Sequence, residues 1–162
     1  MTYDAVDVAD LVQAALLPIR PLAAQRGVRI ESRVGPVPVL SADWDALFKI
    51  LGNLVGNAVK FSNDGGAVRV LVSYDSSAAR LSIVVEDEGV GIEPAHLETI
   101  FDRFAQAPRE EQGRPTGSGL GLFLVRALSE AMGGSATVES ELGRGSRFTV
   151  IVPAQVAECL NE

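Results

Sequence analysis

Residues 51–61 read Leu-Gly-Asn-Leu-Val-Gly-Asn-Ala-Val-Lys-Phe, and the apolar residues in this stretch recur at helical spacing. Extended upstream, the same pattern predicts an amphipathic helix over residues 43–61. Its other face carries Lys49, Asn53, Asn57 and Lys60, with two glycines beside them. Asn and Gly each cost an interior helix about 0.5 to 1 kcal/mol relative to Ala. The pattern therefore predicts a face that presents amides and a cation to a ligand, the alternative being a surface helix of weak propensity.

Composition limits the classes of protein to which the chain can belong. With 162 residues, 47 % of them apolar and 22 % charged, it is long enough for one globular domain with a sizeable core. A net charge of -7 without a basic tract argues against a nucleic-acid surface or membrane contact. One cysteine, Cys159, allows neither a disulfide framework nor a cysteine metal cluster. We expect a cytoplasmic domain, cut from a longer protein that could itself be membrane-anchored.

Periodicity and turn residues predict the remaining elements. Helices are predicted over residues 7–27, with a kink or break at Pro18 and Pro21, and over residues 93–104 and 120–132. Strands are predicted over residues 28–34, 37–40, 67–74, 81–86, 136–140 and 146–152. Residues 1–7 are interpreted as the approach to the first helix, residues 105–116 as a polar loop, and residues 154–162 as a frayed tail. We expect an α+β two-layer sandwich, with helices on one face of a largely antiparallel sheet.

A first glycine cluster, Asp87-Glu88-Gly89-Val90-Gly91-Ile92, follows one of the predicted strands. Its glycines let the backbone turn tightly and approach a ligand closely. The carboxylate of Asp87, held at the strand end, can accept a hydrogen bond from an exocyclic amine such as that of adenine. A plain acidic turn is the alternative for this motif taken alone.

A second cluster, Gly117-Ser118-Gly119-Leu120-Gly121-Leu122, opens the last predicted helix. Backbone N–H groups at a helix start, together with the helix dipole, favour phosphate binding. The alternative is a flexible hinge. The spacing fits neither the Rossmann pattern nor a Walker loop, because the third glycine of the former and the lysine of the latter are missing.

Metal chemistry is suggested by the asparagine helix itself. Mg²⁺ prefers hard oxygen ligands and is often held by few protein groups together with substrate phosphates. Asn57 can supply such an oxygen, and Lys60, on the same face, can neutralise phosphate charge.

The order of these motifs, with Phe-x-x-Phe at residues 101–104 between the two glycine clusters, resembles one family. It is similar to the catalytic and ATP-binding domain of bacterial sensor histidine kinases, within the wider group shared with gyrase, Hsp90 and MutL. The resemblance covers residues 6–153, and we interpret residues 1–153 as a single ATP-binding catalytic domain. It implies the Bergerat fold, a mixed sheet with three helices on one face.

The resemblance also implies roles for individual residues, with ATP and Mg²⁺ as cofactors. Asn57 would bind Mg²⁺, and Asn53 and Lys60 would act at the phosphates. Around the adenine, the resemblance implies Phe61, Asp87, Gly89, Gly91 and Ile92. For the phosphate cradle it implies Gly117, Ser118, Gly119, Leu120 and Gly121. Phe101 and Phe104 would anchor a lid over residues 105–116, in which Arg109 or Arg114 is the candidate for the γ-phosphate.

Three functions remain open at this stage, and the first is favoured. In the first, the chain would be a kinase module that transfers the ATP γ-phosphate to a histidine on a separate dimerisation domain, with a response regulator downstream. Its one histidine, His96, lacks the acidic neighbour of the family's phosphoacceptor. An ATP hydrolase would need a glutamate where Asn53 stands, and an amide cannot serve as a base. A non-catalytic nucleotide sensor is the third possibility.

Overall fold

The computed structural model describes residues 1–103 and 120–158, and its main layer is a five-stranded sheet in the order β2-β4-β5-β7-β6. The strands are β2 (Arg29–Val34), β4 (Ala67–Asp75), β5 (Arg80–Asp87), β6 (Ser135–Glu141) and β7 (Gly145–Pro153). β2 and β4 are parallel, and each of the other neighbouring pairs is antiparallel. The predicted α+β class, with a mixed and mostly antiparallel sheet, is confirmed.

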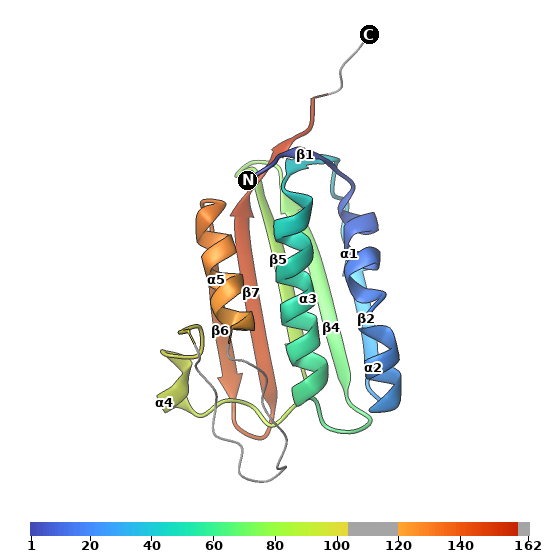
Figure 1. The fold of residues 1–162 in the computed structure, drawn as a ribbon, viewed down its shortest axis with the longest axis vertical. Helices are drawn as coiled ribbons and strands as arrows, with labels where there is room; N and C mark the ends of the chain where they lie inside the picture. Colours follow the sequence, from blue (N-terminus) through green and yellow to red (C-terminus); the bar gives the residue numbers. More distant parts are fainter. Residues whose placement is uncertain (104–119, 159–162) are drawn as a thin grey trace.

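Helices cover one face of this sheet (Figure 1). They are α1 (Val8–Leu16) with α2 (Arg20–Gln25), α3 (Trp44–Phe61) and α5 (Gly121–Ala131), while the short α4 (Pro94–Leu97) lies against β6. The predicted first helix is indeed broken, because Pro18 separates α1 from α2. Pro21 lies in the first turn of α2, where its missing N–H removes no helical hydrogen bond. The helix predicted over residues 93–104 is reduced to α4, so its length was overestimated.

A second, three-stranded sheet in the order β1-β3-β8 was not predicted. It consists of β1 (Asp4–Val6), β3 (Leu40–Ala42) and β8 (Gln155–Val156). Residues 1–7 do lead into α1, whose N-cap is Asp7, but β1 within them was not predicted. The strand predicted over residues 37–40 begins later, at Leu40. The expected fraying does not hold for residues 154–156 either, since Ala154 is buried and its carbonyl accepts a hydrogen bond from Tyr74 Oη at 2.7 Å. Strands this short carry no periodicity that a sequence could display.

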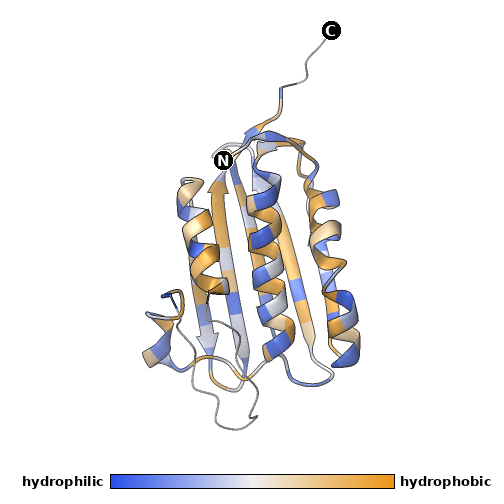
Figure 2. Ribbon diagram, viewed as in Figure 1, coloured by the Kyte–Doolittle hydropathy of each residue, from blue (hydrophilic) through white to orange (hydrophobic). Residues whose placement is uncertain are grey.

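α3 is fixed by the core along one face and by a cap at its first turn. Leu47, Ile50 and Leu51 are fully buried against the sheet, and burying each such side chain contributes about 1.5 to 3 kcal/mol. Figure 2 shows the resulting alternation of hydrophobic and hydrophilic residues along this helix. The Asp43 carboxylate accepts a hydrogen bond from the Ala46 N–H at 3.0 Å, and this bond lowers the pKa of Asp43. The polar face is thus held in one orientation. Within the described residues, no helix has the length and apolar character needed to cross a membrane.

Candidate functional site

The two asparagines of α3 lie against the first residue of α5. Asn53 Nδ2 donates to the Lys49 carbonyl oxygen at 2.7 Å, and Asn53 Oδ1 faces Gly121. A Cβ placed on Gly121 would lie 2.9 Å from that oxygen and 3.8 Å from Asn57 Nδ2. The structure therefore brings together the asparagine helix and the end of the second glycine cluster, which are far apart in the sequence.

The C-terminal end of α3 lies against the loop that follows β5. Ser62 and Gly89 form an isolated antiparallel bridge, and a Cβ on Gly89 would overlap the Phe61 carbonyl oxygen. The Gly89 N–H donates to Asp87 Oδ1 at 3.0 Å, which fixes this carboxylate relative to its own loop. Lys60 Nζ lies 5.6 Å from the centroid of the Phe61 ring. The end of α3 that carries Lys60 and Phe61 thus adjoins the loop that begins at Asp87.

The loop that follows β5 also contacts the β6–β7 hairpin, on the side away from α3. Gly91 has a φ of +76°, and a Cβ there would overlap the Glu141 carbonyl oxygen, so only glycine fits. The Ile92 N–H donates to Ser140 Oγ at 2.8 Å, and Ile92 itself is buried. Ser140 was missed by the sequence analysis, because a serine in a strand gives no signal of a contact with a distant loop.

Phe101 anchors the segment that leads toward the predicted lid. Its ring is buried and meets the Phe148 ring edge to face, with 6.0 Å between centroids and 88° between planes. Asp102 pairs with Arg126 of α5 at 3.4 Å. Several predicted residues lie outside the described part of the chain: Phe104, Arg109, Arg114, Gly117, Ser118, Gly119 and the lid over residues 105–116.

A cleft of about 490 Å³ opens beside Asn53 and Gly121. Its lining includes the exposed Leu120, which is the N-cap of α5, the half-buried Phe123 and Leu124 of α5, and Arg103. Arg103 was not singled out from the sequence, although its position between the two phenylalanines of Phe-x-x-Phe was a usable signal. The cleft thus combines an amide, a helix start and a guanidinium group.

A buried hydroxyl group lies next to the Asp87 loop. Ser62 is 2 % exposed, and among residues 1–103 and 120–158 its Oγ has no hydrogen-bond partner. Leaving such a group unsatisfied costs about 1 to 3 kcal/mol, so this position suits a bound water molecule or a polar ligand atom.

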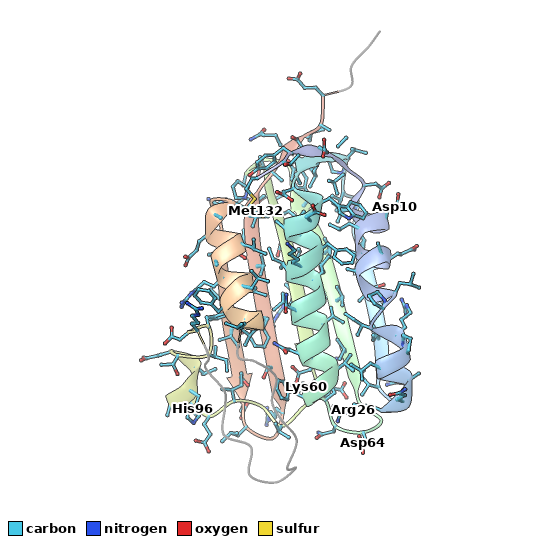
Figure 3. All side chains as sticks on the ribbon, in the orientation of Figure 1. Asp10, Arg26, Lys60, Asp64, His96 and Met132 are labelled. Atoms are coloured by element: carbon cyan, nitrogen blue, oxygen red, sulfur yellow. The ribbon has the colours of Figure 1, made fainter. Side chains whose placement is uncertain are left out.

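The single histidine does not belong to this site. His96 lies on α4 with its side chain 33 % exposed, and its Nε2 is 3.7 Å from Glu93 Oε2 (Figure 3). Among the described residues, no carboxylate other than that of Glu93 lies within ion-pair distance of His96.

Comparison with known proteins places the chain among ATPase-type domains. The family model described as histidine kinase-, DNA gyrase B-, and HSP90-like ATPase matches residues 42–156. The chain is 41 % identical over 153 residues to histidine protein kinase DivJ of Caulobacter vibrioides, covering 93 % of this chain and 25 % of that protein.

Solved structures give the same result. The structure of full-length ShkA in complex with AMPPNP matches with a TM-score of 0.86 and 34 % identity, covering 98 % of this chain and 32 % of that chain. The mycobacterial sensor histidine kinase MprB matches with a TM-score of 0.80 and 25 % identity, covering 95 % of this chain and all of that one. The chain spans about a quarter of DivJ and a third of ShkA.

Proposed function

The chain belongs to the histidine kinase-, DNA gyrase B-, and HSP90-like ATPase family, and we propose that it binds Mg²⁺ and ATP as the catalytic domain of a histidine kinase. One observation carries the proposal. Gly121 meets Asn53 and Asn57 along α3, while the Asp87 loop closes on the end of the same helix. A phosphate-binding helix start and an amine-binding carboxylate are therefore joined by one rigid element.

The adenine end would be formed by Asp87, Phe61 and Ile92. The Asp87 carboxylate is oriented by the Gly89 N–H and can accept from the adenine amine, whereas the carbonyl of guanine would be repelled. The unsatisfied Ser62 hydroxyl beside this loop fits a water molecule or a ring nitrogen of the base. Gly89 and Gly91 would shape the pocket, since neither position admits a side chain.

The phosphate end would be formed by Asn53, Asn57, Lys60 and the start of α5. Among the described residues no three His, Cys, Asp or Glu side chains gather in a way that could hold a metal ion. The Asn57 amide oxygen together with nucleotide phosphates is the ligand set that fits Mg²⁺. When bound, the ion would neutralise charge on the phosphates. Arg103 is the described cation best placed for the γ-phosphate, beside the lid candidates Arg109 and Arg114.

Asn53 supports phosphate transfer rather than hydrolysis. Its Nδ2 is engaged with the Lys49 carbonyl oxygen, and neither atom of a neutral amide can accept the proton of an attacking water molecule. The acceptor would be a histidine on a dimerisation domain outside residues 1–162, with a response regulator as the next partner. The parent protein would place this domain in the cytoplasm.

Calorimetric titration of the purified chain with AMPPNP and Mg²⁺ tests the binding proposal. We expect saturable binding, weakened at least about tenfold in Asp87→Asn, which corresponds to about 1.4 kcal/mol. Asp75→Asn, at the exposed last residue of β4, is the matched control and should bind like the wild type. Equal affinity in the wild type and Asp87→Asn would refute the adenine assignment.

Phosphate transfer is tested in the parent protein, where radiolabelled ATP should give an acid-labile phosphoprotein. Nucleotide binding without incorporation of the radiolabel would instead favour a nucleotide sensor.

A further inference from the structure

Arg26, at the C-terminal cap of α2, reaches across to the last turn of α3. Its Nη1 donates to the carbonyl oxygens of Val59, at 2.8 Å, and of Lys60. Its Nη2 donates to the Ser62 carbonyl oxygen at 2.9 Å. The Arg26 side chain is only 14 % exposed, and Figure 3 shows it together with Lys60 and Asp64 at one end of α3.

These contacts satisfy groups that a helix cannot satisfy itself. The last carbonyls of an α-helix have no intrahelical donor, and the helix dipole gives this end a partial negative charge. A guanidinium group supplies several donors in a fixed plane as well as a positive charge, and charge-assisted hydrogen bonds are the stronger ones. Arg26 therefore replaces water as the partner of these carbonyls.

The donor is itself held firmly. Gly27 has a φ of +67° and turns the chain at the end of α2, where the Val28 N–H donates to the Ala23 carbonyl oxygen at 2.9 Å. The Arg29 N–H then donates to the Gly66 carbonyl oxygen at 3.0 Å. The backbone on both sides of Arg26 is thus tied to the core and to the loop after α3.

The residues that Arg26 holds are continuous with the candidate adenine site. Val59, Lys60 and Ser62 flank Phe61, and Ser62 pairs with Gly89, whose N–H orients the Asp87 carboxylate. A shift of the last turn of α3 would therefore displace the aromatic ring, the lysine and the carboxylate loop together.

We propose that Arg26 is a positioning residue for the nucleotide site, acting through the backbone of the last turn of α3. The inference rests on the proposed nucleotide binding. Asp64 is not the source of the effect: its carboxylate lies 3.6 Å from Arg26 Nη2 but is 89 % exposed, and exposed ion pairs contribute little.

The test compares Arg26→Ala, Arg26→Lys and the control Asp64→Asn at a temperature where circular dichroism shows each variant fully folded. Affinity for AMPPNP with Mg²⁺ is measured by calorimetry. Amide exchange at Ser62 and Gly89 is measured by NMR in the nucleotide-free protein, with Val12 of α1 as the internal reference.

For Arg26→Ala we expect about tenfold weaker binding and faster exchange at Ser62 and Gly89, with no change at Val12. Arg26→Lys should show smaller changes in both affinity and amide exchange than Arg26→Ala, because lysine keeps the charge but loses the planar set of donors. Asp64→Asn should match the wild type.

Wild-type affinity in folded Arg26→Ala would overturn the proposal. So would exchange that accelerates equally at Val12, because that result describes general destabilisation. If the wild type binds no nucleotide, the proposed function fails and the nucleotide part of this inference fails with it. Exchange at Ser62 and Gly89 then still decides whether Arg26 holds the end of α3.

Discussion

Gly121 packs directly on the side chain of Asn53, at a distance that leaves no room for a β-carbon. The contact fixes the start of α5 on the polar face of α3. It also gives a structural reason for glycine at this position that is independent of backbone conformation, because any larger residue would meet the Asn53 amide.

Gly121→Ala should weaken nucleotide binding without unfolding the domain. The new methyl group would lie 2.9 Å from Asn53 Oδ1, so the amide must move and strain its hydrogen bond to Lys49. We expect about tenfold lower affinity for AMPPNP by calorimetry. Gly52→Ala is the matched control, because a Cβ there meets nothing within 4 Å. That change should raise the free energy of unfolding by about 0.5 to 1 kcal/mol and leave affinity unchanged. Equal affinities in the two variants would contradict the assignment of the contact.

Asn57→Ala should remove the dependence of nucleotide binding on Mg²⁺. The wild type is expected to bind AMPPNP more tightly with Mg²⁺ than with a chelator present, because the proposed role of Asn57 is to help hold the ion beside the phosphates. The alanine variant should bind equally weakly under both conditions, in parallel titrations. Asn57→Asp keeps an oxygen ligand and should retain the effect of the metal. A metal effect that persists in Asn57→Ala would show that Asn57 is not the ligand.

The elements that could be predicted from the sequence are those with local signals. The stripe of Leu47, Ile50 and Leu51 predicted α3, and the first glycine cluster predicted the loop that follows β5. Arg26, Ser140 and β8 could not be predicted in the same way. Arg26 and Ser140 each contact a partner more than thirty residues away in the sequence, so no local pattern indicates their roles. β8 is too short to show the alternation typical of a strand. Arg103 could be predicted only in part: the Phe-x-x-Phe motif was recognised, but the arginine inside it was not singled out.

Asp43→Ala should destabilise the domain, and the effect should depend on pH. The carboxylate caps α3, and loss of such a cap typically lowers the free energy of unfolding by about 1 kcal/mol. The hydrogen bond from Ala46 lowers the folded-state pKa of Asp43 below its ordinary value of 3.8. A lowered folded pKa means that the unfolded chain takes up the proton first as pH falls. The charged-cap contribution is therefore complete above about pH 3.8 and declines as pH falls through the folded pKa.

Urea unfolding of the wild type, Asp43→Ala and Asp43→Asn measures this dependence. The pH runs from about 2.5, roughly one unit below the ordinary carboxylate pKa, to about 7, where an ordinary carboxyl group is fully ionised. The gap between wild type and Asp43→Ala should be largest near neutrality and narrow in acid. Asp43→Asn keeps an acceptor oxygen and should lose less stability. A gap that widens in acid would have the wrong sign for a capping carboxylate.

Arg103→Ala should affect the binding of a nucleotide with a γ-phosphate more than the binding of one without it. Arg103 follows the buried Phe101 and the Asp102–Arg126 pair, so its backbone is anchored while its side chain lines the cleft beside Asn53 and Gly121. A guanidinium group binds phosphate through two parallel hydrogen bonds. We expect about tenfold lower affinity for AMPPNP and unchanged affinity for ADP, measured by calorimetry with Mg²⁺ present. Arg33→Ala, on the exposed side of β2, should alter neither affinity. Equal losses for both nucleotides would place Arg103 at the inner phosphates. Unchanged binding of both would instead assign the γ-phosphate to an arginine of residues 105–116.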